Sequence, residues 1–412
     1  MRRIPHTIAL TTLVATVGFA LAEEAIIPSG FTEADYLYSC PADTGNSTCG
    51  IGYSPFVDGD EGKLRFLCQA SHLSYDDPIV FPGVADATHL HQFLGNPHTN
   101  KDSTFATLRV NTDVGTCAGG PLNNTGYWYP AMIRPQSNQV VVPDYIEFYY
   151  TITRDQLADQ TSLACPNPIF ACPMTKVQRI ERGMKMISGF RPSTGTFPLG
   201  NRNFNWQCDD GSSLGKAVFW DPSTPSNGVQ ACPAGQNLTV RLGTSGCWNG
   251  SYDSADHYTH MADPIQDGFG LPTCPATHTK RIVGLSVIIA WSHNGENDYK
   301  QWYLSSDRFN GATYRSGESF HTDFLWAWSQ NIMDAFNAEL NGMCPVGSTC
   351  PPTAYGSGIH VRTSTNGGLG NGTAMKEGVL GIVPTPKPEP DRYRAIPSRA
   401  HGYHRVRVNV TP

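Results

Sequence analysis

Residues 145–152 read Tyr-Ile-Glu-Phe-Tyr-Tyr-Thr-Ile, a run of aromatic and β-branched residues that favours a β-strand. Glycine and proline, at 41 and 31 residues, separate this run from similar short runs, as loops separate strands. Helical periodicity is scarce. The sequence therefore predicts a mainly β fold, a β-sandwich or jelly-roll-like single domain with few short helices and many disulfide-braced loops. The other predicted strands are Ile79–Phe81, Thr104–Val110, Gln139–Val142, Leu238–Leu242 and Ile282–Ala290.

The first 22 residues have the features of a secretory signal peptide. The chain starts with Met-Arg-Arg, and an apolar run extends from about Thr7 to Ala20 before an Ala-x-Ala-like cleavage signal. That run is shorter than the ~20 residues that a membrane-spanning helix needs. No later segment is long and apolar enough to span. We therefore expect a secreted protein, extracellular or periplasmic, with no membrane span.

All twelve cysteines follow this segment. An even number of cysteines in an exported chain predicts disulfides. Spacing does not determine which cysteines pair, and the simplest local loops are Cys40–Cys49, Cys165–Cys172 and Cys344–Cys350. A cluster of cysteines around a metal is disfavoured, because no Cys-x-x-Cys occurs in the chain.

Composition predicts the partners and the domain limits. Charged residues make up 16% of the chain and its net charge is −6, with no long basic run, so a nucleic-acid partner is not expected. Beyond Cys344 the chain becomes rich in Gly, Ser and Thr and then in Pro. We interpret residues 25–344 as the functional domain, residues 345–390 as a Gly/Pro-rich linker and residues 391–412 as a C-terminal tail.

Three short histidine motifs place potential metal ligands close together. In the first, His89 and His91 lie on either side of Leu90. Residues two apart on a strand point to the same face, so both histidines can bind one ion while Leu90 faces the core. The turn residues that follow are expected to bring His98 near the same end of the strand, as a supporting residue.

The second motif lies within residues 253–260 and contains His257 and His260. On a helical turn these two histidines share a face, and in a loop they can still converge. Asp256 can bind the same ion directly or orient an imidazole ring from behind.

The third motif contains His321 and Asp323, which share one face of an extended segment. Aromatic neighbours on both sides would exclude water from one side of this site. Asp323 is expected to bind the ion or to support a ligand.

The three motifs together predict one shared metal site, because cysteines held in disulfides are not free to act as ligands. Imidazole suits copper, zinc, iron and nickel. The alternative is three separate hydrogen-bonding networks in a β-sandwich. The predicted ligands are His89, His91, His257, His260 and His321. The predicted supporting residues are Asp256, Asp323 and His98.

Several stretches of the chain resemble DUF1996, a domain family found in secreted fungal and bacterial proteins. The resemblance runs in order across about residues 68–344. It implies an extracellular β-rich domain whose recurrent histidines form a metal site, with copper as the leading candidate. The resembling stretches are Asp77–Gly83, His89–Phe93, Tyr127–Pro130, Cys247–Gly250, Asp256–His260, Cys274–His278 and His321–Phe324.

Three functions remain open at this point, and whether the protein is an enzyme is open with them. The first is a secreted copper-binding protein, with zinc as the alternative metal, that acts as an oxidoreductase on phenolic or polysaccharide-derived substrates. The second is a hydrolase, either metal-assisted or a glycosidase that uses Asp256 or Asp323 in a carboxylate pair. The third is a non-catalytic carbohydrate- or surface-binding module, with stacking residues such as Tyr127, Trp128, Trp206 and Trp302.

The partner expected in each case is a small molecule or a polysaccharide. The sequence gives no indication of the oligomeric state.

Overall fold

The structure is a computed structural model that describes most of the chain between residues 61 and 333. Outside that stretch it describes short strands at residues 37–39, 359–361, 386–387 and 392–393. The predicted signal peptide lies outside the described residues, as does most of the predicted linker and tail, so these boundaries stay predictions. Between residues 61 and 333 the residues not described are 111–114, 118–122, 154–176, 192–194, 200–203, 209–212, 216–231, 234, 267–271, 294–298 and 331–332.

Two six-stranded sheets form most of the fold, and neighbouring strands in both are antiparallel. The first sheet has the spatial order β12 (Ser213–Gly215), β11 (Asn205–Cys208), β13 (Leu238–Gly243), β19 (Gly284–Trp291), β8 (Tyr145–Thr153) and β2 (Glu61–Cys68). The aromatic run of residues 145–152 thus forms β8, where Phe148 lies opposite both Phe66 and Val287. The strands predicted at residues 238–242 and 282–290 are confirmed as β13 and β19.

The second sheet contains two of the three histidine motifs. Its spatial order is β10 (Thr196–Leu199), β9 (Lys185–Arg191), β21 (His321–Leu325), β5 (Gly126–Pro130), β4 (His91–Gly95) and β3 (Ala70–Ser74). The mainly β prediction is confirmed, whereas the jelly-roll-like connectivity stays a prediction.

Shorter elements lie around the two sheets. Three of them are two-stranded sheets: β1 (Leu37–Ser39) with β22 (Ile359–Val361), β16 (Ile265–Gln266) with β17 (Pro272–Thr273), and β23 (Pro386–Lys387) with β24 (Arg392–Tyr393). Two are three-stranded sheets, in the order β15 (Met261–Ala262), β14 (Cys247–Trp248) and β18 (Lys280–Arg281), and in the order β20 (Tyr303–Leu304), β6 (Met132–Arg134) and β7 (Gln139–Val140). The helical elements are α2 (Phe105–Arg109) and the 3-10 segment η5 (Ser305–Gly311). The strand predicted over residues 139–142 is therefore confirmed in part, as β7.

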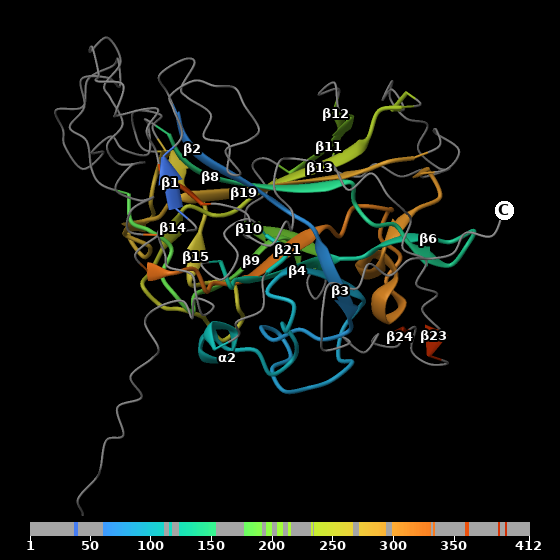
Figure 1. The fold of residues 1–412 in the computed structure, drawn as a ribbon, viewed down its shortest axis with the longest axis horizontal. Coiled ribbons are helices and arrows are strands. Elements are labelled where there is room, and N and C mark those ends of the chain that lie inside the picture. Colours follow the sequence, from blue (N-terminus) through green and yellow to red (C-terminus); the bar gives the residue numbers. More distant parts are fainter. Residues whose placement is uncertain are drawn as a thin grey trace, which may run out of the picture.

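The two sheets are stacked as two layers (Figure 1). Aromatic side chains of the two layers contact one another. Tyr127 of β5 contacts Phe148 of β8 with ring centroids 4.6 Å apart, and Tyr129 contacts Trp291 at 6.3 Å. Because side chains alternate along a strand, Trp128 points away from the first sheet, to what we call the outer face of the second sheet. The loop before α2 and α2 itself lie on the outer side of this sheet (Figure 1).

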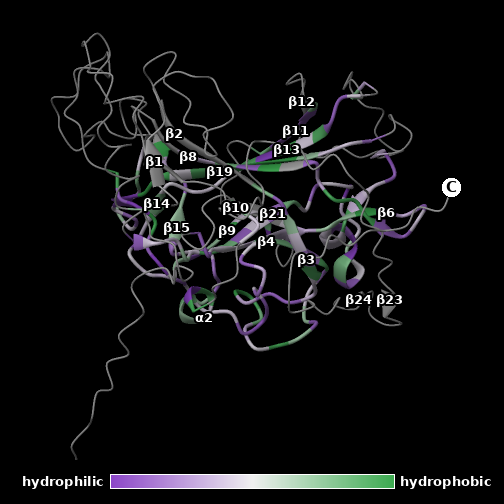
Figure 2. Cartoon of the chain, viewed as in Figure 1, coloured by the Kyte–Doolittle hydropathy of each residue, from purple (hydrophilic) through white to green (hydrophobic). Residues whose placement is uncertain are grey.

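Hydrophobic residues lie along the strands of both layers, and hydrophilic residues gather in the connections around them (Figure 2). Burial decides the role of the four aromatic residues considered for sugar stacking. All four are at most 1% exposed, so they stabilise the core and do not form a surface platform. These residues are Tyr127, Trp128, Trp206 and Trp302.

The strand predicted over Thr104–Val110 is wrong, because this segment forms the helix α2. The Thr104 hydroxyl accepts a hydrogen bond from the Thr107 backbone N–H, and the Thr104 N–H donates to the Thr107 hydroxyl at 2.8 Å. This reciprocal pair caps the helix and outweighs the weak strand preference of the local residues.

The strand predicted over Ile79–Phe81 is also wrong, because these residues form a turn. The Asp77 carboxylate accepts hydrogen bonds from the backbone N–H groups of Ile79 and Val80 at 2.9 and 3.0 Å. An aspartate that binds its own following backbone favours a turn over a strand ladder.

The described residues contain three disulfides, namely Cys68–Cys117, Cys208–Cys232 and Cys247–Cys274. Multiple disulfides are typical of proteins that fold in an oxidising, extracytoplasmic compartment. In the part of the chain that is described, no helix is both long and apolar enough to span a membrane. The predicted local pairs lie outside the described residues and stay predictions; these are Cys40–Cys49, Cys165–Cys172 and Cys344–Cys350.

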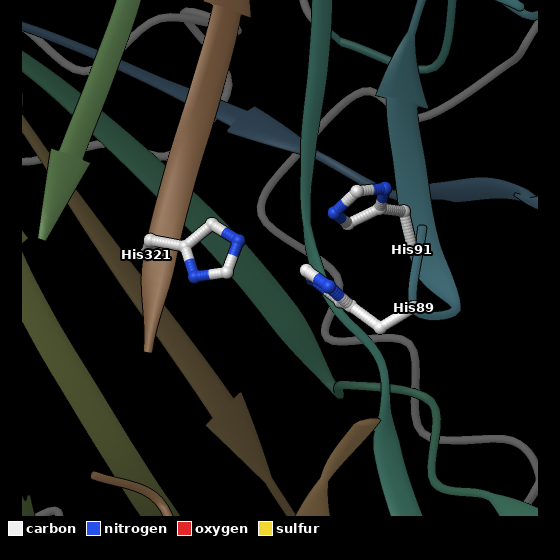
Figure 3. Close-up of side chains that lie close together, drawn as sticks. All are labelled: His89, His91 and His321. Carbon is white, nitrogen blue, oxygen red and sulfur yellow. The ribbon is translucent and has the colours of Figure 1, made fainter. Parts of the chain in front are cut away.

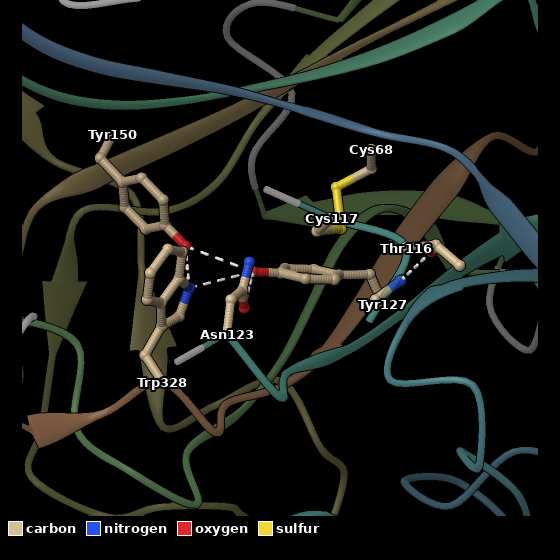
Figure 4. Close-up of a disulfide and its surroundings, with 8 residues drawn as sticks. Cys68, Thr116, Cys117, Asn123, Tyr127, Tyr150 and Trp328 are labelled. Carbon is tan, nitrogen blue, oxygen red and sulfur yellow. Dashed lines mark hydrogen bonds between the residues drawn. A yellow bond between two sulfur atoms is a disulfide. The ribbon is translucent and has the colours of Figure 1, made fainter. Parts of the chain in front are cut away.

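Buried hydrogen bonds tie the two sheets together beside the Cys68–Cys117 disulfide (Figure 4). The Trp328 indole N–H lies 3.2 Å from the Tyr127 hydroxyl of the second sheet and 3.0 Å from the Tyr150 hydroxyl of the first. Burial raises the pKa of Tyr127 to about 12, so its hydroxyl keeps its proton and donates to Asn123. These bonds fix the spacing of the layers at one end of the second sheet.

A second buried polar network is built around Asp307 in η5, which is fully buried. Its carboxylate accepts backbone N–H bonds from Leu304 at 2.7 Å, Gly317 at 2.8 Å and Ser319 at 3.1 Å. The Ser319 hydroxyl donates a further bond of 2.6 Å. These bonds hold the segment that leads into β21.

The pH dependence of stability should report this buried carboxyl. Burial raises the pKa of Asp307 to about 6. The folded chain therefore holds this proton to a higher pH than the unfolded chain, so stability falls as pH rises. Relative to Asp307→Asn, the free energy of unfolding of the wild type should decrease by about 2 kcal/mol between pH 4 and pH 6.5. Urea unfolding of both chains with a chelator present measures this difference, and a difference independent of pH would contradict it.

Candidate metal centre

Strand pairing brings two histidines from distant parts of the chain to one end of the second sheet. His91 begins β4 and His321 begins β21, and these strands flank β5 on its two sides. His91 lies opposite Pro130 of β5, and continuing the pairing of Asp323 with Trp128 places His321 opposite the same residue. Both side chains lie on the outer face of the sheet, together with Asp323.

His89 joins the group through the strand alternation that its spacing predicts. Leu90 is fully buried in a hydrophobic cluster, so the residues on either side of it point the other way. The rings of His89 and His91 lie 4.3 Å apart and those of His89 and His321 lie 5.0 Å apart, measured between centroids. Figure 3 shows the three rings directed toward one another.

The three imidazoles are close enough to share one ion. Their potential ligand atoms all lie within 4.8 Å of one another. Metal–imidazole bonds of about 2.0–2.1 Å then need only small side-chain rotations. All three side chains are buried, with exposures of 6% for His89, 0% for His91 and 4% for His321. Among the described residues this is the one such group of histidine, cysteine or carboxylate ligands.

Hydrogen bonds orient the rings so that Nε2 is free for a ligand. The Nδ1–H of His91 donates to the Asp76 carbonyl at 3.0 Å, and that of His321 donates to the Ser319 carbonyl at 2.8 Å. Because a carbonyl can only accept, the proton of each neutral ring is on Nδ1 and the lone pair is on Nε2. His89 pairs its Nδ1 with the Thr88 hydroxyl at 3.1 Å. Metal-binding histidines are fixed by this kind of second hydrogen bond.

Burial keeps the three rings uncharged. It lowers the pKa of His91 and of His321 to about 4 and that of His89 well below its ordinary value. Protonated imidazole cannot bind a metal, so the neutral form is the one that the site needs.

Asp323 faces the same space as the imidazoles. Its Oδ2 lies 3.9 Å from the His321 Nε2 and has no hydrogen-bond donor among the described residues. Burial raises the pKa of Asp323 well above its ordinary value, and the nearby Asp77 carboxylate raises it further. We did not predict from the sequence that Asp77 lies near this site. The local feature that marks Asp77 in the sequence is the Asp-Pro pair that it forms with Pro78, which is typical of a turn.

The structure does not bring the second histidine motif into this group. Both ring nitrogens of His260 have partners, the Ser254 hydroxyl at 3.1 Å and the Lys185 carbonyl at 2.7 Å. His257 pairs its Nδ1 with the Asp253 carboxylate at 2.9 Å. These histidines brace their own loop against β9.

Two predicted supporting residues also lie outside the group. Asp256 accepts hydrogen bonds from the Ser254 hydroxyl at 2.8 Å and the Thr259 N–H at 2.9 Å, so it caps a local turn. His98 is exposed and follows the far end of β4 from His91.

Comparison with known proteins adds the family. The profile of DUF1996, described as a domain of unknown function, matches residues 77–328, more than half of the 412-residue chain. The matched range contains all three clustered histidines and Asp323. No curated protein and no solved structure matches the chain.

Substitutions should distinguish the three clustered histidines, which we expect to bind the metal, from His260, which we expect to have only a structural role. His89→Ala, His91→Ala and His321→Ala should each weaken Cu(II) or Zn(II) binding by more than about 100-fold, because each removes a direct ligand. His260→Gln should lower the free energy of unfolding by about 1–3 kcal/mol and leave metal affinity unchanged. Isothermal titration calorimetry and urea unfolding measure the two quantities. Equal loss of affinity in His260→Gln and His91→Ala would show that the ion lies elsewhere.

Proposed function

The chain belongs to the DUF1996 family, and we propose that it is a secreted protein that holds one copper ion on His89, His91 and His321. The activity that this site supports best is oxidoreduction of a small phenolic or polysaccharide-derived substrate. The disulfides and the predicted signal peptide support an extracellular location.

One observation carries this proposal. The Nε2 atoms of His89 and His91 and the Oδ2 of Asp323 are buried, and none has a hydrogen-bond partner among the described residues. An unsatisfied buried polar atom costs about 1–3 kcal/mol. The two imidazole nitrogens are accounted for by a cation that both can contact, and the Asp323 oxygen lies 3.9 Å from the Nε2 of the third imidazole, His321. A purely structural network would satisfy them with donors and acceptors of its own.

Donor chemistry favours copper. Three imidazoles suit copper and zinc, and divalent copper binds nitrogen sites more tightly than the other first-row divalent ions. Three protein ligands also leave a coordination position open, which is typical of catalytic sites. Zinc is the alternative metal. The Asp323 Oδ2 lies 3.9 Å from the Nε2 of His321, one of the three imidazoles.

A copper ion would supply one-electron redox chemistry at this centre when bound. The chain's own residues hold the rings and exclude water. Phe93 contacts the His91 ring at 6.0 Å, and the half-buried Phe309 contacts the His89 ring at 5.5 Å. Of the two aromatic neighbours, Phe309 is the partly exposed one, so we propose that a substrate approaches beside it.

Asp323 favours a second candidate function, a zinc-dependent hydrolase. A buried carboxyl with a raised pKa beside a metal-bound water can hold a proton for the leaving group. Asp256 is less suited to a glycosidase carboxylate pair, because its Oδ1 is occupied in a turn and its Oδ2 pairs with Arg191 at 3.5 Å.

Metal loading tests the proposal. The purified chain, first stripped with a chelator and then dialysed against Cu(II), should retain one copper per chain. The loaded protein should unfold at a higher temperature, because the ion binds the folded state alone. It should also oxidise a simple phenol such as catechol in air, whereas the zinc-loaded protein should not.

The exposed His98 provides the matched control. His98→Ala should retain one equivalent of copper, and His91→Ala should retain none. Retention of less than half an equivalent of copper by the wild type would refute the proposed metal site. Activity restored by zinc and not by copper would replace the oxidoreductase with the hydrolase.

A further inference from the structure

The buried carboxylate of Asp307 is linked to His321 through one residue. Asp307 accepts bonds from both the N–H and the hydroxyl of Ser319, at 3.1 and 2.6 Å. The carbonyl of the same Ser319 accepts the Nδ1–H of His321 at 2.8 Å. Ser319 is fully buried, so no solvent molecule competes for these bonds. The direction in which the His321 Nε2 points therefore depends on where Asp307 holds Ser319.

A second link runs from the same turn to the first histidine motif. Asp307 also accepts the Leu304 N–H at 2.7 Å, which fixes the start of η5. The next residue, Ser305, donates its hydroxyl to the carbonyl of Leu90. Leu90 lies between His89 and His91, so this bond fixes the backbone that carries both ligands.

A third link runs through the end of η5. Phe309 follows Asp307 by two residues and its ring contacts the His89 ring edge-on. The chain then turns through Asn310 and Gly311, both with positive φ of 52° and 76°. Such a turn holds its shape only when the surrounding bonds determine it. The bonds of Asp307 to Gly317 and Ser319 close this loop on its other side.

We propose that Asp307 is a positioning residue of the metal centre, whose four hydrogen bonds set the directions of His89, His91 and His321 together. The inference rests on the proposed metal site and adds a residue that touches no ligand atom. A buried carboxylate gives little net stability, because its desolvation offsets its bonds. The four hydrogen bonds of Asp307 instead orient three histidines that come from two distant segments of the chain. Residues behind metal ligands typically contribute 10–100-fold to affinity.

The test compares Asp307→Asn with a matched control in the first sheet. Glu147 is a buried carboxylate on β8 of the first sheet that accepts a hydrogen bond from the Tyr149 hydroxyl at 2.8 Å, whereas His91 and His321 belong to the second sheet. Glu147→Gln makes the same acid-to-amide change there. The readouts are copper affinity by competition titration, the electron paramagnetic resonance spectrum of bound Cu(II) and the thermal unfolding temperature.

Asp307→Asn should bind copper about 10–100-fold more weakly and show an altered spectrum. Glu147→Gln should keep wild-type affinity and spectrum even where its unfolding temperature falls as far. Wild-type affinity and spectrum in a folded Asp307→Asn would overturn the positioning role while leaving the metal site intact. A wild type that binds no copper would overturn both.

Ser305→Ala covers the case in which Asp307→Asn does not fold. It removes only the hydroxyl bond to Leu90, and it should alter the Cu(II) spectrum and weaken binding less than Asp307→Asn. A spectrum identical to wild type in Ser305→Ala would refute the link to the first histidine motif.

Discussion

The pairing of β4 and β21 with the two sides of β5 is the constraint on which the candidate site depends. It places His91 and His321, which are 230 residues apart in the chain, at the same end of one sheet and on the same face. A shift of one residue in either strand would turn its histidine into the layer between the sheets. The aromatic contacts between Tyr127 and Phe148 hold the register, because they bury the opposite face.

Loops on the outer face of the second sheet orient the histidine rings through hydrogen bonds. Backbone carbonyls of Asp76 and Ser319 take the Nδ1 protons, and burial keeps the rings neutral. The buried Nε2 atoms of His89 and His91 and an oxygen of Asp323 lack hydrogen-bond partners among the described residues. In this buried environment each ring is neutral, which is the form in which several imidazoles could share one cation.

Sequence predicts the parts of this arrangement that depend on local periodicity. Strand alternation gave the common face of His89 and His91 and that of His321 and Asp323. The resemblance to DUF1996 is confirmed by the match over residues 77–328. Convergence could not be predicted from spacing, because His260 also lies in a short histidine motif, yet both its nitrogens are occupied by local partners. Asp307 has no local signature at all, since its partners are backbone groups brought close by the fold.

The central claim is that three imidazoles from two distant segments bind one ion. Crystals of the copper-loaded protein, measured on both sides of the copper absorption edge, test it most directly. We predict one anomalous peak per chain, about 2.0 Å from the Nε2 atoms of His89, His91 and His321. A peak beside His257 or His260, or the absence of an ordered peak in crystals of fully copper-loaded protein, would contradict it.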